Sequence, residues 1–299
     1  MAGGIRAFSH PVLCVGVEVM AEKALAESYR TCSRMQRRHD PTFYLATRFL
    51  PGAVRPGVHA VYGYVRHADD IVDDPRPEAG PRARRDALDA WEAALQRALD
   101  GEPAEHPIVA ALVDTGRRHD LPLGLLKRYL ESMRLDCAPV RMASDAALDD
   151  YMEGSAATVG RIMAPLLGTP PGAHESLAQL GVAFQLANFV RDVPIDWKLD
   201  RIYLPGLDEA DLRAGRAGAR TRNHVARHVA RARRLFADSA GVEALLAPSM
   251  RTGVRLARGI YGRVLDRVER NGFDVLGRRA RLAPWEAPGA VAGALMGGR

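Results

Sequence analysis

The chain repeats apolar residues at helical spacing along almost its whole length. Apolar positions that recur every three or four residues mark one face of a helix, whereas strict alternation marks a strand. The helical pattern covers residues 21–37, 42–50, 55–73, 86–99, 107–118, 122–135, 145–167, 174–193, 223–238 and 249–270. No segment alternates convincingly, so the pattern predicts an all-α, single-domain helical bundle with its site in a central cavity between helices.

Prolines set several of the expected helix ends. The residue before a proline avoids the α region, so the first helix should stop at Asp40, before Pro41. Thr42 is expected to cap the helix that follows. Pro194 lacks a backbone N–H, and we expect it to kink or end the helix over residues 174–193.

Two of the predicted helices each carry a pair of aspartates. Asp69 and Asp73 are four residues apart, and so are Asp192 and Asp196. Four residues turn an α-helix by about 400° and advance it by about 6 Å, so each pair lies on one face. Like charges at this spacing cost a few tenths of a kcal/mol, which indicates that something offsets the repulsion.

Divalent cations would offset it, because Mg²⁺ is commonly held by one or two carboxylates together with substrate phosphates. Arg66 and Arg191 accompany the two pairs and would bind a bridging diphosphate. Gln185 and Asn188 continue the stripe of the second pair. A solvated acidic helix face explains one such pair, but it explains two pairs poorly. The candidate metal ligands are Asp69, Asp73, Asn188, Asp192 and Asp196.

Other polar residues have a structural interpretation that competes with a functional one. Tyr62 fits core packing as well as it fits a substrate-binding role. Arg134 and Asp136 are interpreted as a surface pair. His224 and His228 are four residues apart, but without an acid or an HExxH frame we interpret them as a solvated face. The small residues over 154–160 fit either tight helix packing or room for a ligand.

Composition changes this picture little. The 299 residues carry a net charge of +6, which comes from arginine and is compatible with peripheral contact with an anionic membrane. No nucleic-acid motif accompanies the charge, so nucleic-acid binding is not expected. No apolar run approaches the roughly 18–20 residues that span a bilayer. The three cysteines have neither metal-ligand nor disulfide spacing, so a reducing cytoplasm is expected.

A single domain is predicted over residues 21–281, with a short segment on either side of it. Residues 1–20 are expected to form a flexible extension, whose apolar patch VLCVGV makes a poor signal peptide. Residues 282–299 are rich in Gly and Ala, and we expect a disordered tail.

Five blocks of sequence resemble, in order, the phytoene/squalene synthase family of head-to-head prenyltransferases. YGYVRHADDIVDD (62–74) resembles its first aspartate-rich motif, and FQLANFVRDVPIDWKLDRIYLP (184–205) resembles its second. HDPTFYLATRFLP (39–51), YMEGSAATVG (151–160) and YGRVLDRVERNGFDVLGRRAR (261–281) resemble its N-terminal, central and C-terminal segments. The bacterial phytoene synthases look nearest. The resemblance implies an isoprenoid-synthase-like helical bundle.

The resemblance also implies roles for single residues. Thr42 would face a diphosphate through its hydroxyl, and Arg201 would bind a diphosphate. Tyr151 lies on the helix that lines the prenyl channel in the family. Tyr203 would form a polar wall near the reacting carbons. The final proton would go to Tyr203, Tyr261 or the released diphosphate.

The reaction that the resemblance implies joins two geranylgeranyl diphosphates head-to-head. Mg²⁺, or Mn²⁺ in its place, would promote loss of diphosphate, and a cyclopropylcarbinyl diphosphate would rearrange to phytoene, a carotenoid precursor. No Rossmann glycine fingerprint is present, so no NADPH is expected. The protein is expected in the cytoplasm, with peripheral contact at the inner face of the membrane left open.

Three alternatives stay open at this point. Two farnesyl diphosphates would give a 30-carbon product by the same chemistry. A class I terpene cyclase would use the same scaffold, because Pro41 replaces a basic residue of the family and Pro194-Ile195 replaces its Gly-Glu. A catalytically silent paralogue would bind prenyl lipids or a partner enzyme.

Overall fold

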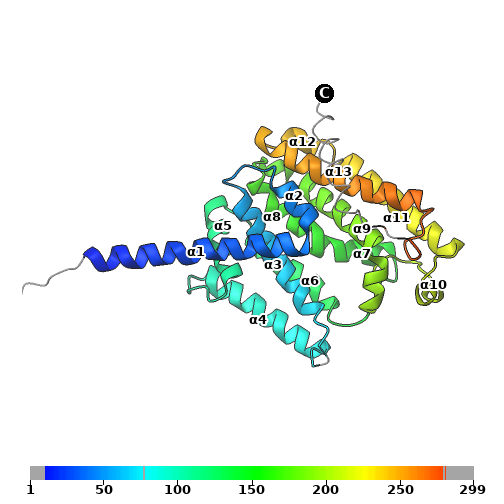
Figure 1. Cartoon of the computed structure of the whole chain (residues 1–299), viewed down its shortest axis with the longest axis horizontal. Helices are drawn as coiled ribbons and strands as arrows, with labels where there is room; N and C mark the ends of the chain where they lie inside the picture. The colour runs from blue at the N-terminus through cyan, green and yellow to red at the C-terminus, as the bar shows by residue number, and fades with distance from the viewer. Residues whose placement is uncertain (1–10, 77, 279, 281–299) are drawn as a thin grey trace, which may run out of the picture.

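The computed structural model describes residues 11–76, 78–278 and 280, and helices dominate it (Figure 1). The α-helices are α1 (Pro11–His39), α2 (Pro41–Thr47), α3 (Arg55–Val72), α4 (Pro81–Leu99), α5 (Pro107–His119), α6 (Leu126–Leu135), α7 (Asp145–Met152), α8 (Thr158–Leu166), α9 (His174–Lys198), α10 (Glu209–Ala214), α11 (Ala219–Asp238), α12 (Val242–Leu245) and α13 (Pro248–Arg270). Two 3₁₀-helices, η1 (Leu123–Leu125) and η3 (Pro171–Ala173), and a π-helix, η2 (Glu153–Ala157), complete the helical part. The predicted all-α fold is confirmed.

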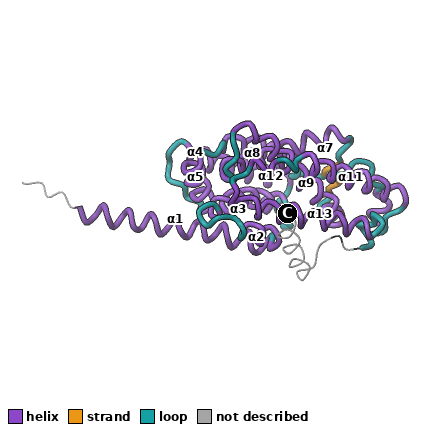
Figure 2. The backbone as a smooth tube through the Cα atoms, turned by 90° about the horizontal axis from the view of Figure 1, so that it is seen from above, coloured by secondary structure: helices purple, strands orange, loops and turns teal. Residues whose placement is uncertain are grey.

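The helices that carry the aspartate pairs are central to the bundle. The first pair lies at the end of α3, which packs against α1 and α5, and the second pair lies on α9, which packs against α8, α11 and α13. The N-terminal part of α1 projects beyond the bundle in both views (Figures 1 and 2). The remaining helices therefore enclose the two acidic faces rather than leave them on the outside.

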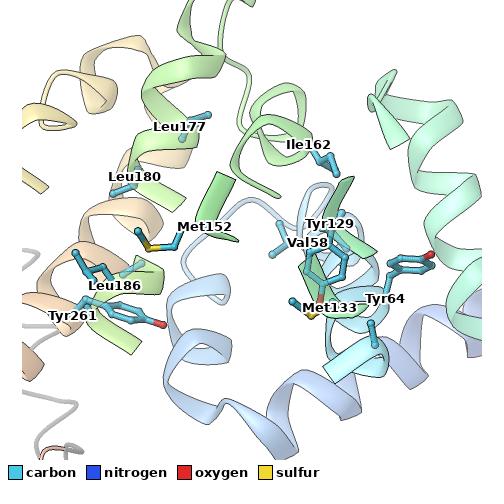
Figure 3. Packing of buried hydrophobic residues seen from close by; sticks show 14 of the residues in the cluster. Val58, Tyr64, Tyr129, Met133, Met152, Ile162, Leu177, Leu180, Leu186 and Tyr261 are labelled. Atoms are coloured by element: carbon cyan, nitrogen blue, oxygen red, sulfur yellow. The ribbon is translucent and has the colours of Figure 1, made fainter. Parts of the chain in front are cut away.

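A single cluster of buried apolar residues runs through the bundle. Figure 3 shows Leu177, Leu180 and Leu186 of α9 on one side of it and Tyr129 and Met133 of α6 on the other. Burial of such side chains is the main favourable term in folding. The apolar stripes that the sequence shows at helical spacing therefore face one common core.

Helix ends follow local chemistry, with one difference from expectation. Asp40, not Thr42, caps α2, because its carboxylate Oδ1 accepts a hydrogen bond from the Phe43 N–H at 2.8 Å. Pro41 then occupies the first helical position, where a missing N–H costs nothing. The prediction that Thr42 caps this helix was wrong, since an aspartate one residue before the proline reaches the same free N–H groups.

Pro194 was expected to kink or end its helix; it does not end the helix, because α9 continues to Lys198. A proline inside a helix removes one hydrogen bond and crowds the preceding turn. Val190 and Val193 are buried on one side of Pro194, and Trp197 packs against the core on the other. Packing on both sides keeps the helix continuous, and Asp196 therefore stays on the same helix as Asp192.

Two strands of two residues each, β1 (Val140–Arg141) and β2 (Arg201–Ile202), pair in parallel, although the sequence pattern predicted no strand. Strands this short show no alternation that a sequence could reveal. Their pairing fixes Arg201 beside the end of α6. The predicted helices over 122–135 and 145–167 are also interrupted, by η1 and by η2.

Helices α8 and α9 approach each other closely at glycines. A Cβ atom on Gly160 would lie 2.3 Å from the Leu177 carbonyl oxygen, and one on Gly181 would lie 2.7 Å from the Ala156 carbonyl oxygen. Tight packing therefore accounts for these glycines. Ala156 and Gly160 also line the central cavity. The small-residue segment therefore both packs tightly against α9 and leaves room for a ligand.

The two histidines of α11 do not form a solvated face. His228 is only 1% exposed, and its Nε2 lies 3.5 Å from the Pro205 carbonyl oxygen. His224 is half-buried against Gly206. This prediction was wrong because α11 packs this face against α9 and the segment that follows β2.

The expected flexible extension and disordered tail fall largely outside the described residues. Helix α1 begins at Pro11, ten residues before the predicted start. Within the described part of the chain, no helix combines the length and the apolar character that crossing a membrane requires.

Candidate active site

The first aspartate pair is held by side chains from other elements. Asp69 on α3 accepts a hydrogen bond from the Tyr129 hydroxyl of α6 at 3.2 Å. Asp73 follows α3 directly, and its Oδ1 accepts a hydrogen bond from Arg201 Nη1 at 2.6 Å. Burial, with Asp73 and Asp136 nearby, raises the pKa of Asp69 to about 7. Two separate elements therefore fix this pair.

Arg201 connects the first pair to the rest of the site. It is only 5% exposed, and its Nη2 donates to the carbonyl oxygens of Val72 and Asp136, at 2.9 Å each. Burial of a guanidinium is costly unless it is paired and hydrogen-bonded, and Arg201 meets both conditions. Its position follows from the pairing of β2 with β1.

The second aspartate pair lies on α9. The Arg191 guanidinium holds Asp192 from the same helix through Nε and Nη2, at 3.0 and 2.5 Å. Burial, and then the charge of Asp192, raise the pKa of Asp196 well above its usual range. Asn188 donates to Gln185 at 3.4 Å, while its buried Oδ1 has no hydrogen-bond partner among the described residues. An acceptor without a donor at this position suits a bound cation.

Asp136 is a site residue that the sequence analysis missed. It follows α6, is 3% exposed, and accepts hydrogen bonds from the hydroxyls of Tyr151 at 2.5 Å and Tyr203 at 2.8 Å. Burial raises its pKa to about 6, although Arg201 acts in the opposite direction. The predicted surface pair does not form, because Arg134 instead binds Asp89 and Glu92 on α4.

One cavity of about 470 Å³ brings these residues together. It is lined by every predicted site residue except Thr42, namely Tyr62, Arg66, Asp69, Asp73, Tyr151, Gln185, Asn188, Arg191, Asp192, Asp196, Arg201, Tyr203 and Tyr261. Thr42 is half-buried on α2 and does not contribute to the wall. The sequence reasoning also missed Asp40 and Tyr129, which line the cavity. Tyr129 lies on the apolar stripe of its helix, so the sequence pattern indicates that it faces the interior of the bundle.

The cavity has an ionic part and an apolar part. Among the described residues, the ionic part has six aspartates against three arginines: Asp40, Asp69, Asp73, Asp136, Asp192 and Asp196, with Arg66, Arg191 and Arg201. The apolar lining is Phe43, Ala46, Leu50, Val58, Val65, Val72, Met133, Ala156, Val159, Met163, Leu167, Leu177, Leu180, Phe184, Phe189, Val254 and Ala257. Such a cavity fits a molecule with an anionic head and a long apolar tail.

Aromatic side chains line the cavity as well. Tyr203 stacks on Phe189 with ring centroids 4.2 Å apart, and Tyr151 lies 5.2 Å from Tyr203. Tyr261 of α13 lies 4.7 Å from Phe184. Burial raises the pKa of Tyr261 to about 12, with Asp40 adding to the effect. Aromatic faces attract cations, so these rings can stabilise positive charge on a bound molecule.

The donor set also fits divalent cations. In the described part of the chain, no three His, Cys, Asp or Glu side chains converge at metal-binding distance. Mg²⁺ needs fewer protein ligands when substrate phosphates supply the rest. Among the residues described, the ionic part has six aspartates against three arginines, and burial first, then neighbouring aspartates, raise the pKa values of Asp69 and Asp196. Cations bound between α3 and α9 would offset the charge of the ionised carboxylates.

The fold and the cavity, with its ionic part and its apolar part, are those of an isoprenoid-synthase-fold protein. The family model described as squalene/phytoene synthase matches residues 36–286. A phytoene synthase of Thermus thermophilus is 35% identical over 274 residues, which cover 88% of this chain and 91% of the relative. A 15-cis-phytoene synthase of Synechococcus elongatus is 33% identical over 282 residues, covering 88% and 90%.

Solved structures agree with these relatives. A squalene synthase from Alicyclobacillus acidocaldarius is 31% identical with a TM-score of 0.74, covering 83% of this chain and 95% of that one. A dehydrosqualene synthase in complex with a ligand has a TM-score of 0.82 at 22% identity, covering 92% and 97%, and shows the same fold. The chain belongs to the squalene/phytoene synthase family and is a prenyltransferase.

Proposed function

We propose that this prenyltransferase condenses two geranylgeranyl diphosphates head-to-head to phytoene, by way of a cyclopropylcarbinyl diphosphate. The observation that carries the proposal is the single cavity in which an ionic head meets a long apolar wall. Relatives named phytoene synthase at 30–35% identity over most of the chain support the choice of product. An alternative 30-carbon condensation of farnesyl diphosphate is favoured by the 31% identity to a squalene synthase.

The proposal includes a requirement for Mg²⁺, which Mn²⁺ could replace. The ions would be held by Asp69 and Asp73 on one side and by Asn188, Asp192 and Asp196 on the other. When bound, the ions would neutralise charge on the departing diphosphate.

The chain itself would bind and orient the two diphosphates. Arg66, Arg191 and Arg201 line the ionic part of the cavity, where guanidinium groups form charge-assisted hydrogen bonds with phosphate oxygens. Each of them is paired with an aspartate in the free protein. The arginines are therefore already directed when a diphosphate arrives, and they can share their donors between the aspartate and the ligand.

The apolar wall would hold the prenyl chains and keep water from the allylic cation. Phe43, Phe184 and Phe189 line the cavity together with the aliphatic residues. An allylic cation that meets water gives an alcohol, so exclusion of water is required for carbon–carbon bond formation. Loss of a proton from carbon ends the reaction, and Tyr203, Tyr261 or the released diphosphate are the candidate acceptors.

The proposal places the enzyme in carotenoid biosynthesis and in the cytoplasm. Peripheral contact with the inner face of the membrane is part of it, because the apolar substrate and product partition into lipid. No reductive step, and hence no NADPH, is part of the proposed reaction.

Mass spectrometry of extracted products tests the proposal. Purified protein is incubated with Mg²⁺ and geranylgeranyl diphosphate, and separately with farnesyl diphosphate, with a chelator-treated sample as the control. We expect a 40-carbon hydrocarbon from the former and nothing with the chelator. A 30-carbon product from farnesyl diphosphate alone would change the substrate. Cyclic 15- or 20-carbon products would identify a terpene cyclase, and intact diphosphates would indicate a binding protein.

A further inference from the structure

Asp136 is a buried carboxylate of the cavity that belongs to neither aspartate pair. Its Oδ2 accepts a hydrogen bond from the Tyr151 hydroxyl at 2.5 Å, and its Oδ1 accepts one from the Tyr203 hydroxyl at 2.8 Å. The two tyrosines come from α7 and from the segment after β2, so Asp136 joins two distant parts of the chain. Both of its carboxylate oxygens are committed to phenols.

The direction of these hydrogen bonds limits what the tyrosines can do. Burial raises the pKa of Tyr151 and of Tyr203 well above the usual range, so each phenol keeps its hydrogen and donates it to Asp136. A phenol has only one hydrogen to donate. The phenols therefore offer a molecule in the cavity their oxygen lone pairs and ring faces, and no hydrogen-bond donor.

The rings that Asp136 holds form a continuous aromatic wall with Phe189. Tyr203 stacks on Phe189 at 4.2 Å, and Tyr151 lies 6.0 Å from Phe189 and 5.2 Å from Tyr203. All three rings line the cavity. Hydrogen bonds polarise the groups that make them, and a phenol that donates to a carboxylate becomes richer in electrons. Ring faces of this kind attract a cation.

The aromatic wall lies beside the part of the cavity where positive charge would develop. The backbone oxygen of Asp136 accepts from Arg201 Nη2 at 2.9 Å, while Arg201 Nη1 donates to Asp73 at 2.6 Å. One arginine therefore connects the wall to the first aspartate pair, where a diphosphate would leave. In the proposed reaction, the carbon that loses the diphosphate would become cationic in the cavity that these rings line.

We infer that Asp136 is a positioning residue, which fixes the phenols of Tyr151 and Tyr203 so that their oxygen lone pairs and ring faces stabilise the allylic cation. This inference rests on the proposed function, because it requires an ionised prenyl chain in the cavity. In this role Asp136 acts through the two tyrosines, because both of its carboxylate oxygens already accept their hydrogen bonds. It should therefore affect the chemical steps more than substrate binding.

Asp136→Asn is the variant that tests this role. The amide has nearly the same shape, but it offers only one oxygen and adds two N–H donors, so at least one phenol loses its acceptor. We expect kcat to fall about 100-fold, in the range seen when one preorganised electrostatic contact is lost. KM should stay within about 3-fold, as expected when an interaction made in the transition state is removed. Unreacted cyclopropylcarbinyl diphosphate and prenyl alcohols should rise as fractions of the products.

A double-mutant cycle separates action through the tyrosines from direct action. Tyr151→Phe with Tyr203→Phe should reproduce the loss of kcat, and adding Asp136→Asn to this pair should lower kcat by less than about 3-fold more. Asp114→Asn is the matched control, because Asp114 accepts a hydrogen bond from Tyr29 at 2.6 Å outside the cavity. The control should keep the wild-type kcat and product ratio.

Several outcomes would overturn the inference. A kcat of Asp136→Asn within about 3-fold of wild type would do so, and so would an undiminished further loss in the double-phenylalanine background. If Asp136→Asn loses its helical circular dichroism, the test rests on the variant with both Tyr151→Phe and Tyr203→Phe. A kcat equal to that of the wild type in this variant would overturn the role. If the wild type uses only farnesyl diphosphate, the proposed chain length is wrong. The kcat values of the variants relative to wild type, measured on farnesyl diphosphate, then test the role of Asp136. A wild type that turns over neither diphosphate contradicts the proposed function and this role with it.

Discussion

The two aspartate pairs face one cavity but are held in different ways. In the first pair, Asp69 is bound by Tyr129 of α6 and Asp73 by Arg201 of β2, so both partners come from other elements. Each of these contacts joins residues that are at least 60 positions apart in the chain. The rest of the fold therefore sets the geometry of the first pair.

In the second pair, one ion pair comes from the same helix. Arg191 binds the neighbouring Asp192, and no hydrogen bond from the described part of the chain reaches Asp196. Burial and the charge of Asp192 disfavour ionisation of Asp196. We propose that the protein preorganises the first pair, whereas bound cations would complete the second.

The largest expected effect is on turnover and should not distinguish the two pairs. Asp69→Asn and Asp192→Asn should each lower the rate of diphosphate release by about 10³-fold or more, because a carboxamide is a weak ligand for Mg²⁺. Asp150→Asn, at an exposed aspartate on α7, is the control. Circular dichroism should show an intact fold in all three. Near-normal release by either pair variant would contradict its assignment as a ligand.

The next effect concerns stability and tests how firmly Arg201 holds the first pair. Arg201→Met leaves Asp73 and two carbonyl oxygens without their donor, and loss of one partner of a buried pair costs about 3 kcal/mol. Arg128→Met, which breaks an exposed pair with Asp150, should cost less than about 1 kcal/mol. Urea unfolding measures both. Equal costs would mean that Arg201 does not fix the first pair.

The sequence predicts the two helices of the site because helical spacing encodes which residues share a face. Asp69 and Asp73, and likewise Asp192 and Asp196, are four residues apart, and each pair faces the cavity as predicted. The resemblance to a family supplied Arg201, which no periodicity could indicate. A short motif was enough to place these residues in the cavity, and their roles in binding metal and diphosphate stay predictions.

Asp136 could not be placed from sequence, since it is a single aspartate between a helix end and a two-residue strand. Its partners Tyr151 and Tyr203 lie 15 and 67 positions away, and only the folded chain brings them together. His228 was misassigned for a related reason, because packing of another helix determines its burial. Thr42 was assigned a cap that Asp40 provides, since both residues can reach the free N–H groups.

A smaller effect should appear in the stability of the metal-free protein. Burial and Asp192 raise the pKa of Asp196, so the folded state binds more protons than the unfolded state above about pH 4. The contribution of Asp196 to stability is therefore lost as pH rises through its folded pKa. Asp196→Asn removes this loss, so at pH 7 with a chelator it should raise Tm by about 2–4 °C, equivalent to about 1 kcal/mol.

The pH profile provides the control for this prediction. The difference in Tm between Asp196→Asn and wild type should be least at about pH 4 and should grow as pH rises. Adding Mg²⁺ should reverse the order, because only the wild type keeps the carboxylate ligand. A constant difference across pH, with or without Mg²⁺, would show that ionisation of Asp196 is not the cause.

The smallest effect on turnover is expected at Pro194, which lies within the second motif. Pro194 offers no N–H to the Val190 carbonyl oxygen, so Pro194→Ala should restore one helical hydrogen bond and stabilise the protein by about 1 kcal/mol. Asp192 and Asp196 already line the same cavity on a continuous helix, so turnover should stay within about 3-fold. Parallel measurements of urea unfolding and product formation test both parts. A loss of turnover above about 10-fold would mean that the proline sets the direction of Asp196, and that the second pair is shaped by its own backbone as firmly as the first is by other elements.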